Sequence, residues 1–190
     1  MNYYEKNALD YIEKTSSIDM SDTYKEFLSY ISKNGKILDV GFGSGRDSLH
    51  FKNDGYDVLG IDIVDEFIRH AKDLGLNVKK ENVIDISYKN EFDGVFACAS
   101  LLHLKEDQLI IALSKLKDSL KDEGIIYMSF KEGNFSGIRD GRYYLDMNEE
   151  NMAKILDTVG LKLIKCWRNT DKLNRGNVWI SFIVRDVISK

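Results

Sequence analysis

The sequence has 190 residues, of which 43% are hydrophobic and 31% are charged, and its formal net charge is -4. This size and composition predict one globular domain over residues 1–190 with a sizeable core, and the negative charge disfavours a protein that tracks a nucleic-acid backbone. No apolar run approaches the roughly 20 residues of a membrane helix, and the N-terminus lacks the layout of a signal peptide, so we expect a cytoplasmic protein with no membrane partner.

Helices and strands are expected to alternate along most of the chain. Helical periodicity predicts two helices at the start, over residues 3–14 and 22–32, and four more further along. Apolar runs between them predict seven strands. The further helices are expected over residues 45–53, 64–74, 105–120 and 148–158, and the strands over residues 36–40, 57–61, 76–80, 92–97, 124–130, 161–167 and 178–184.

This alternation predicts an α/β fold in which a mainly parallel sheet is covered by helices on both faces. The last two strands differ, because the polar segment 169–177 that joins them is too short for a crossover helix, and they should form an antiparallel hairpin. The two cysteines, Cys98 and Cys166, lie in apolar segments without metal-ligand spacing. We therefore expect them to be small buried side chains, and no metal site is predicted.

The glycine-rich turn after the first strand, within residues 37–47, indicates a nucleoside site. A phosphate-binding P-loop would need a Lys-Ser/Thr pair after its last glycine, where this loop has Arg46 and Asp47. A dinucleotide fingerprint would need a glycine where Arg46 stands, and Gly45 comes one residue too early. Asp39, at the end of the strand, would also repel a pyrophosphate. The loop thus disfavours phosphate ligands.

S-adenosylmethionine (SAM) suits such a loop, because it carries an ammonium group, no phosphate, and one carboxylate that a helix N-terminus can receive. Gly41, Gly43 and Gly45 would let the backbone approach this ligand closely. A glycine turn needed only for the chain path would leave Asp39 and Asp62 unexplained. Asp62 ends the second strand, where an acid can accept hydrogen bonds from both ribose hydroxyls.

A third acid, Asp85, follows the third predicted strand. Its carboxylate would accept a hydrogen bond from the adenine amine, while Ile84 or Ile86 packs on the ring. Taken alone, Asp85 is equally well explained as a loop cap, and its agreement with Asp39 and Asp62 is what favours the binding role.

These motifs resemble those of the class I SAM-dependent methyltransferases over nearly the whole chain. Residues 37–45 resemble the first motif, with Phe42 where cysteine is common, and residues 92–103 resemble the fourth strand and the loop that faces the transferred methyl. Within the class, the chain is most similar to the small bacterial tellurite-resistance-type and ubiquinone/menaquinone-type members. The cofactor-binding residues that the resemblance implies are Asp39, Gly41, Phe42, Gly43, Gly45, Arg46, Asp62, Ile63, Asp85, Ile86 and Ala99.

The resemblance also implies a Rossmann-like, seven-stranded, mostly parallel sheet with a final antiparallel strand. SAM is the cofactor expected for such a fold. Residues 1–33 are expected to form a helical cap over the cofactor site. In that cap, Tyr3 and Tyr11 are candidates for substrate binding, with simple aromatic packing as the alternative.

The acceptor side of the site is less clearly marked. His103 is the one histidine in the segment expected to face the methyl, and it would act as a base or orient the acceptor, or else only cap and pack. Residues 131–144 are expected to be a long mobile loop at the carboxyl end of the sheet. Its side chains Arg139, Arg142 and Tyr143 would line an anionic or aromatic acceptor pocket, or else lie in solvent.

The leading hypothesis is therefore a methyltransferase with a small-molecule acceptor. A methyltransferase acting on RNA or another macromolecule is an alternative, but the chain contains no proline, and the proline-containing motifs of amino- and cytosine-C5-methyltransferases of nucleic acids are thereby excluded. A SAM-binding protein without catalysis is the second alternative. The sequence specifies neither the acceptor atom nor the oligomeric state.

Overall fold

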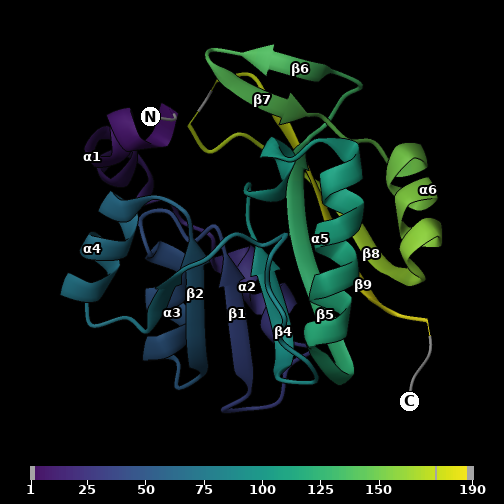
Figure 1. Ribbon diagram of the computed structural model, residues 1–190, viewed down its shortest axis with the longest axis horizontal. Helices are drawn as coiled ribbons and strands as arrows, with labels where there is room; N and C mark the ends of the chain where they lie inside the picture. Colours follow the sequence, from purple (N-terminus) through teal and green to yellow (C-terminus); the bar gives the residue numbers. More distant parts are fainter. Residues whose placement is uncertain (1–2, 174, 188–190) are drawn as a thin grey trace.

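The computed structural model describes residues 3–173 and 175–187. It consists of a central sheet with helices on both faces, and a separate hairpin above one end of the sheet (Figure 1). The helices are α1 (Tyr3–Thr15), α2 (Ser21–Leu28), α3 (Arg46–Asn53), α4 (Asp65–Asp73), α5 (Glu106–Ser119) and α6 (Glu149–Val159), with a 3-10 helix, η1, at Leu101–His103. The strands are β1 (Lys36–Val40), β2 (Asp57–Asp62), β3 (Val78–Lys80), β4 (Phe92–Ala97), β5 (Leu120–Lys131), β6 (Ser136–Arg139), β7 (Arg142–Leu145), β8 (Leu161–Thr170) and β9 (Val178–Asp186).

The seven strands of the sheet lie in the order β3-β2-β1-β4-β5-β9-β8. The first five are parallel, and β9 is antiparallel to both β5 and β8. The predicted fold class is confirmed, including the closing antiparallel hairpin. From β1 the chain proceeds outward to β2 and β3 and then returns to β4 on the other side of β1. Ligands bind at such a switch point in α/β sheets, beyond the carboxyl ends of the strands.

Alternating side chains along the strands supply two separate cores. On β4, Val95 packs in the core beneath α5 and α6, whereas the next residue, Phe96, packs with α2 and α3 on the opposite face. Phe96 stacks on Tyr127 of β5, with ring centroids 4.5 Å apart, and contacts Phe27 of α2 edge to face. Side chains that alternate between faces in this way are buried on both sides, as parallel strands require.

A third, smaller core joins α1 to α4 beside the glycine loop. Ala8 of α1 packs with Phe67 and Ala71 of α4 and with Phe42 of the loop. None of the helices in the described residues combines the length and the apolar character that crossing a membrane would require.

Residues 131–144 are not the open loop expected from the sequence. They continue β5 and then form the hairpin β6–β7, paired from Ser136 with Leu145 to Arg139 with Arg142. The two turn residues, Asp140 and Gly141, have φ of +51° and +74°. Asp-Gly is a favoured pair for such a two-residue hairpin turn, so the local signal for this hairpin is present in the sequence.

Several element boundaries also differ from expectation. The second helix ends at Leu28 rather than at residue 32, β3 is reduced to three residues, and β5 begins at Leu120 rather than at residue 124. These changes leave the sheet intact. The two shortened elements show that flanking apolar residues such as Ile31 and Leu76 pack in the core without extending the element.

Candidate functional site

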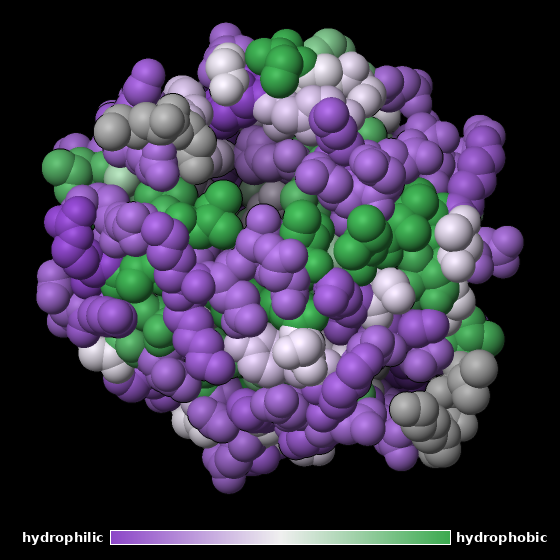
Figure 2. All heavy atoms as spheres, in the orientation of Figure 1, coloured by the Kyte–Doolittle hydropathy of each residue, from purple (hydrophilic) through white to green (hydrophobic). Residues whose placement is uncertain are grey.

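A cavity of about 820 Å³ lies at the carboxyl ends of the parallel strands. Its wall combines the glycine loop, the loop after β4, η1, α1, the hairpin β6–β7 and the segment between β8 and β9. Figure 2 shows the face of the molecule hollowed below the hairpin. The volume lies within the range of small-molecule sites.

The glycine loop is shaped by left-handed backbone at the end of β1. Gly41 and Gly43 have φ of +67° and +54°, which side-chain-bearing residues rarely adopt. A Cβ at Gly41 would lie 2.5 Å from the Cβ of Ser100, and one at Gly43 would lie 2.9 Å from the ring of Tyr11. Both glycines are therefore required by backbone conformation and by close neighbours.

Asp62 connects the end of β2 to this loop. One carboxylate oxygen accepts hydrogen bonds from the backbone N–H groups of Ile63 (2.7 Å) and Val64 (3.0 Å), and the other accepts one from Gly43 (3.1 Å). Burial raises the pKa of this carboxyl group. The oxygen that faces Gly43 keeps acceptor capacity for a hydroxyl. The side chain of Ile63 beside it is 47% exposed, an apolar surface next to the acid.

Asp39 lies beneath the loop rather than on the cavity wall. Its side chain is 1% exposed, and Ser48 of α3 donates a hydrogen bond of 2.6 Å to it. Burial, and then the charge of Asp47, raise the pKa of Asp39. The carboxyl group thus joins β1 to α3, and it reaches a ligand in the cavity only through the loop.

Arg46 and Asp47 form a bidentate ion pair at the start of α3, with nitrogen–oxygen distances of 2.7 and 2.9 Å. The hydroxyl of Tyr24 in α2 also donates to Asp47, and Arg46 donates to the backbone carbonyl of Thr15 at the end of α1. Arg46 lines the cavity, but its charge is balanced by Asp47. The contact between Tyr24 and Asp47 spans 23 residues, and nothing in the local sequence pattern indicates it.

The expected ribose and adenine contacts all lie outside the lining of this cavity: Asp62, Ile63, Ile84, Asp85 and Ile86. Asp85 is exposed in a turn in which its N–H donates to the carbonyl of Asn82 (2.9 Å). Ile86 is 1% exposed and belongs to the core under α5. Ile84, between them in the same segment, is half-buried. Phe42 and Ala99, by contrast, line the cavity, and Ala99 has a strained φ of +51°.

His103 is held at both ring nitrogens. Nδ1 lies 2.8 Å from the carbonyl oxygen of Tyr143, and because a carbonyl only accepts, Nδ1 carries the proton. Nε2 then accepts from the hydroxyl of Tyr4 at 2.7 Å. Burial lowers the pKa of His103 to about 4, so the ring is neutral at physiological pH. Of these two partners, only Tyr143 is expected near the acceptor from the sequence.

Arg142 completes this group from the hairpin. It donates to the hydroxyl of Tyr4 (3.2 Å), and its guanidinium carbon lies 4.0 Å from the centre of the Tyr3 ring. The structure therefore brings Tyr3, Tyr4, Arg142 and His103 together, although Tyr4 and His103 are 99 positions apart in the sequence. Arg139 instead pairs with Asp146 at 2.8 Å. Of the remaining predicted substrate residues, Tyr11 covers Gly43, and Tyr143 contributes its backbone carbonyl to His103 while its hydroxyl bonds Ser136.

The sequence of this chain matches a known protein family and several curated relatives. Residues 37–124, from β1 into β5, match the family model of a methyltransferase domain. The ubiquinone biosynthesis O-methyltransferase of Actinobacillus pleuropneumoniae serotype 7 is 30% identical over 156 residues, which are 68% of this chain and 66% of that protein. The chain spans about half to two thirds of the length of the first curated relatives that it matches.

Solved structures share the fold across almost the whole chain. The 1,6-didemethyltoxoflavin-N1-methyltransferase of Burkholderia thailandensis, solved with 1,6-didemethyltoxoflavin and S-adenosylhomocysteine, superposes with a TM-score of 0.80 at 19% identity. The match covers 97% of this chain and 84% of that one. The [4+2]-cyclase SpnF superposes with a TM-score of 0.75 at 14% identity, covering 97% and 94%. Through its methyltransferase domain and its sheet order, the chain belongs to the class I SAM-dependent methyltransferase family.

Proposed function

We propose that this chain binds SAM at the glycine loop and Asp62, and transfers the methyl group to a small-molecule acceptor in the cavity. One observation carries the proposal: a single cavity is lined both by the glycine loop and by the group formed by Tyr4, His103 and Arg142. The B. thailandensis relative, which holds S-adenosylhomocysteine and a small heterocycle together, supports this assignment. SpnF shows that the fold alone does not determine the reaction.

The residues present fit SAM. The left-handed loop lines the cavity through Gly41, Phe42 and Ser44, and the N-terminus of α3 can receive a carboxylate. Asp62 can accept hydrogen bonds from ribose hydroxyls, and exposed Ile63 can contact the base. Bound SAM supplies a methyl group already activated by its sulfonium, so the protein mainly orients the acceptor and excludes water.

The chain's own contribution to proton movement centres on His103. Its Nε2 lone pair is engaged by Tyr4, so an acceptor proton can be taken only when that hydrogen bond is released. Because burial lowers the pKa of His103 to about 4, the ring is a weak base. It suits an acceptor that is already ionised or easily ionised, which it would orient rather than deprotonate.

The test is methyl transfer from labelled SAM, screened across thiols, tellurite or selenite, quinol precursors and bulk RNA. We expect transfer to one of the small molecules, and His103→Ala should lower turnover while leaving SAM affinity unchanged. Transfer only to RNA would replace the small-molecule assignment with the macromolecular one. Binding of SAM without transfer to any acceptor would favour the non-catalytic alternative, and no binding would end the proposal.

A further inference from the structure

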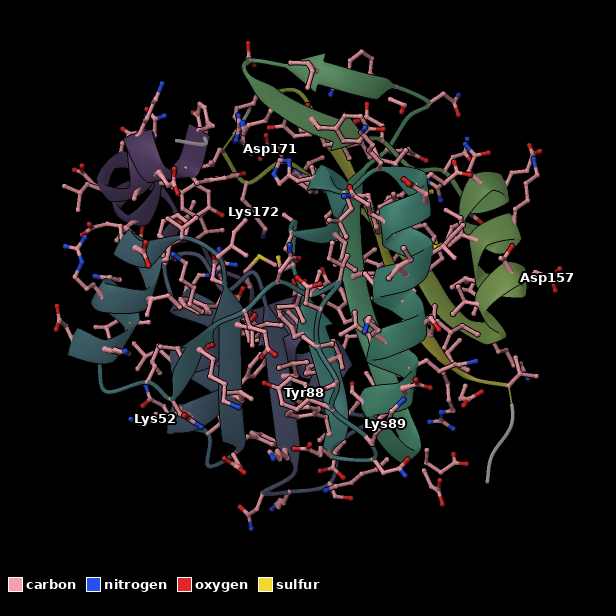
Figure 3. The ribbon with its side chains drawn as sticks, viewed as in Figure 1. Lys52, Tyr88, Lys89, Asp157, Asp171 and Lys172 are labelled. Atoms are coloured by element: carbon pink, nitrogen blue, oxygen red, sulfur yellow. The ribbon has the colours of Figure 1, made fainter. Side chains whose placement is uncertain are left out.

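Positive side chains gather around Tyr144 on the hairpin side of the cavity. Lys131 lies with its ammonium 4.5 Å from the centre of the Tyr144 ring, and the guanidinium carbons of Arg142 and Arg139 lie 5.2 and 5.5 Å from it. Arg175 approaches from the segment between β8 and β9. Figure 3 labels Asp171 and Lys172 of this segment, close to the hairpin and to the start of α1.

Two of these four cations are neutralised within the protein. Arg139 pairs with Asp146 (2.8 Å), and Arg175 forms a bidentate pair with Asp171 at 2.6 and 3.0 Å. Nearby Glu132 is engaged by Arg168 at 2.7 Å. The carboxylates of Asp146, Asp171 and Glu132 are therefore already matched to cations, while Asp140, exposed in the hairpin turn, also lines the cavity.

Lys131 and Arg142 have no such partner. Within residues 3–173 and 175–187, neither side chain forms an ion pair with a carboxylate. Burial, and then the charges of Arg139 and Arg175, lower the pKa of Lys131. Arg142 donates to the hydroxyl of Tyr4, but its Nε is buried without a hydrogen-bond partner in the part of the chain that the structure describes.

A buried donor without an acceptor, beside a second unmatched cation, is unfavourable unless something compensates it. An anion in the cavity would do so. The Nε edge of a guanidinium presents two parallel N–H groups, which match the two oxygens of an acid group, and an ammonium adds a point charge. The Tyr144 ring between them is buried, so the surface for a planar ligand comes from the half-buried aromatic side chains that line the same cavity, Tyr4, Tyr11 and Trp179.

We propose that the acceptor is a small aromatic acid whose acid group, a carboxylate or a phosphate, binds between Arg142 and Lys131. This inference rests on the proposed function and names its substrate class. It assigns Arg142 and Lys131 to acceptor recognition, and it assigns Arg139 to holding the hairpin through Asp146. A weakly basic His103 is consistent with such an acceptor, because the acid group supplies the orientation.

Binding experiments can separate this inference from the proposed function. The full chain would be saturated with S-adenosylhomocysteine and titrated with benzoate, phenyl phosphate or neutral benzamide, using calorimetry and ligand-observed NMR. We expect at least one of the two acids to bind at least about ten-fold more tightly than benzamide, since charge-assisted hydrogen bonds are stronger than neutral ones. Arg142→Gln and Lys131→Gln should each weaken that acid by about ten-fold or more, without changing the affinity for S-adenosylhomocysteine.

Two further variants control for lost charge and for loosened packing. Arg69→Gln removes an exposed cation on α4 that pairs with Glu66, and it should leave acid binding unchanged. Tyr4→Phe removes the hydroxyl that Arg142 contacts but keeps the guanidinium, so acid binding should persist. Equal binding of acids and benzamide, or an Arg142→Gln protein that binds acids like the wild type, would overturn the inference while the cofactor still binds. Loss of S-adenosylhomocysteine binding in the wild type would instead refute the proposed function.

Discussion

Acidification should lower the free energy of unfolding of this protein through His103. The substitution His103→Gln should remove this contribution to the decrease. Burial lowers the pKa of His103 to about 4 in the folded state, whereas an unfolded histidine titrates near its ordinary value of 6.5. Between these values the unfolded chain binds one proton more than the folded chain. The contribution of the neutral ring to the free energy of unfolding is therefore fully present above about pH 6.5, and it is lost as the pH falls toward 4.

The magnitude follows from the two pKa values. At about pH 5 an unfolded histidine with a pKa of 6.5 is almost fully protonated, while the folded ring with a pKa of about 4 is about one-tenth protonated. The difference amounts to about 2 kcal/mol of unfolding free energy relative to about pH 7.5. Asp39 acts in the opposite direction over this window, because its raised pKa means that stability is lost as the pH rises.

Urea unfolding at about pH 5 and about pH 7.5 isolates the His103 contribution. For each protein, the change in unfolding free energy between the two pH values is measured, and the variant's change is subtracted from that of the wild type. Gln retains an amide that can donate to the carbonyl of Tyr143, so the site stays filled. We expect a difference of about 2 kcal/mol for His103→Gln. A value near zero for His103→Gln would show that the ring is not buried and neutral, and the tautomer argued above would be refuted with it.

Two further predictions concern the donor side of the site. Asp62→Ala should weaken S-adenosylhomocysteine binding by about 1.5–3 kcal/mol in calorimetry, because charge-assisted hydrogen bonds to the ribose are lost. Asp65→Ala, which removes an exposed acid paired with Lys80, is the matched control, and equal affinities for the two variants would reject the assigned role of Asp62. Ala99→Gly should raise the unfolding free energy by about 1 kcal/mol, since alanine is strained at a φ of +51°. A loss of stability would mean that the alanine methyl contributes more packing than its backbone costs.

The sheet and the donor loop were predictable because their signals are local. Apolar runs alternate with helical periodicity, and the parallel pairing of β1 with β2 sets Val40 opposite Ile61. That register brings Asp62 to the glycine loop. An acid 19 positions further along the chain thus becomes a neighbour of Gly43. Asp85 follows β3, which is only three residues long, in an exposed turn outside the cavity lining, and its contact with adenine stays a prediction.

The acceptor side was only partly predictable, because long-range contacts build it. Charged and glycine residues between 131 and 144 favoured a loop, although the Asp-Gly pair at residues 140 and 141 is a hairpin signal that outweighs them. The partnership of Tyr4 with His103 has no local signature. Neither has the pairing that neutralises Arg139 but leaves Arg142 unmatched, and this difference decides which arginine can bind an anion.

Helix α1 couples the two sides of the site. Tyr11 covers Gly43 of the donor loop, and Tyr4 bonds His103 on the acceptor side. Their rings meet edge to face, with centroids 5.4 Å apart, although the helix is interrupted between them at Asn7. A movement of α1 that freed Nε2 of His103 would therefore also shift the ring above the glycine loop. Arg46 also holds the far end of α1 through Thr15, so helix α3 beside the glycine loop and His103 on the acceptor side are joined through the same helix.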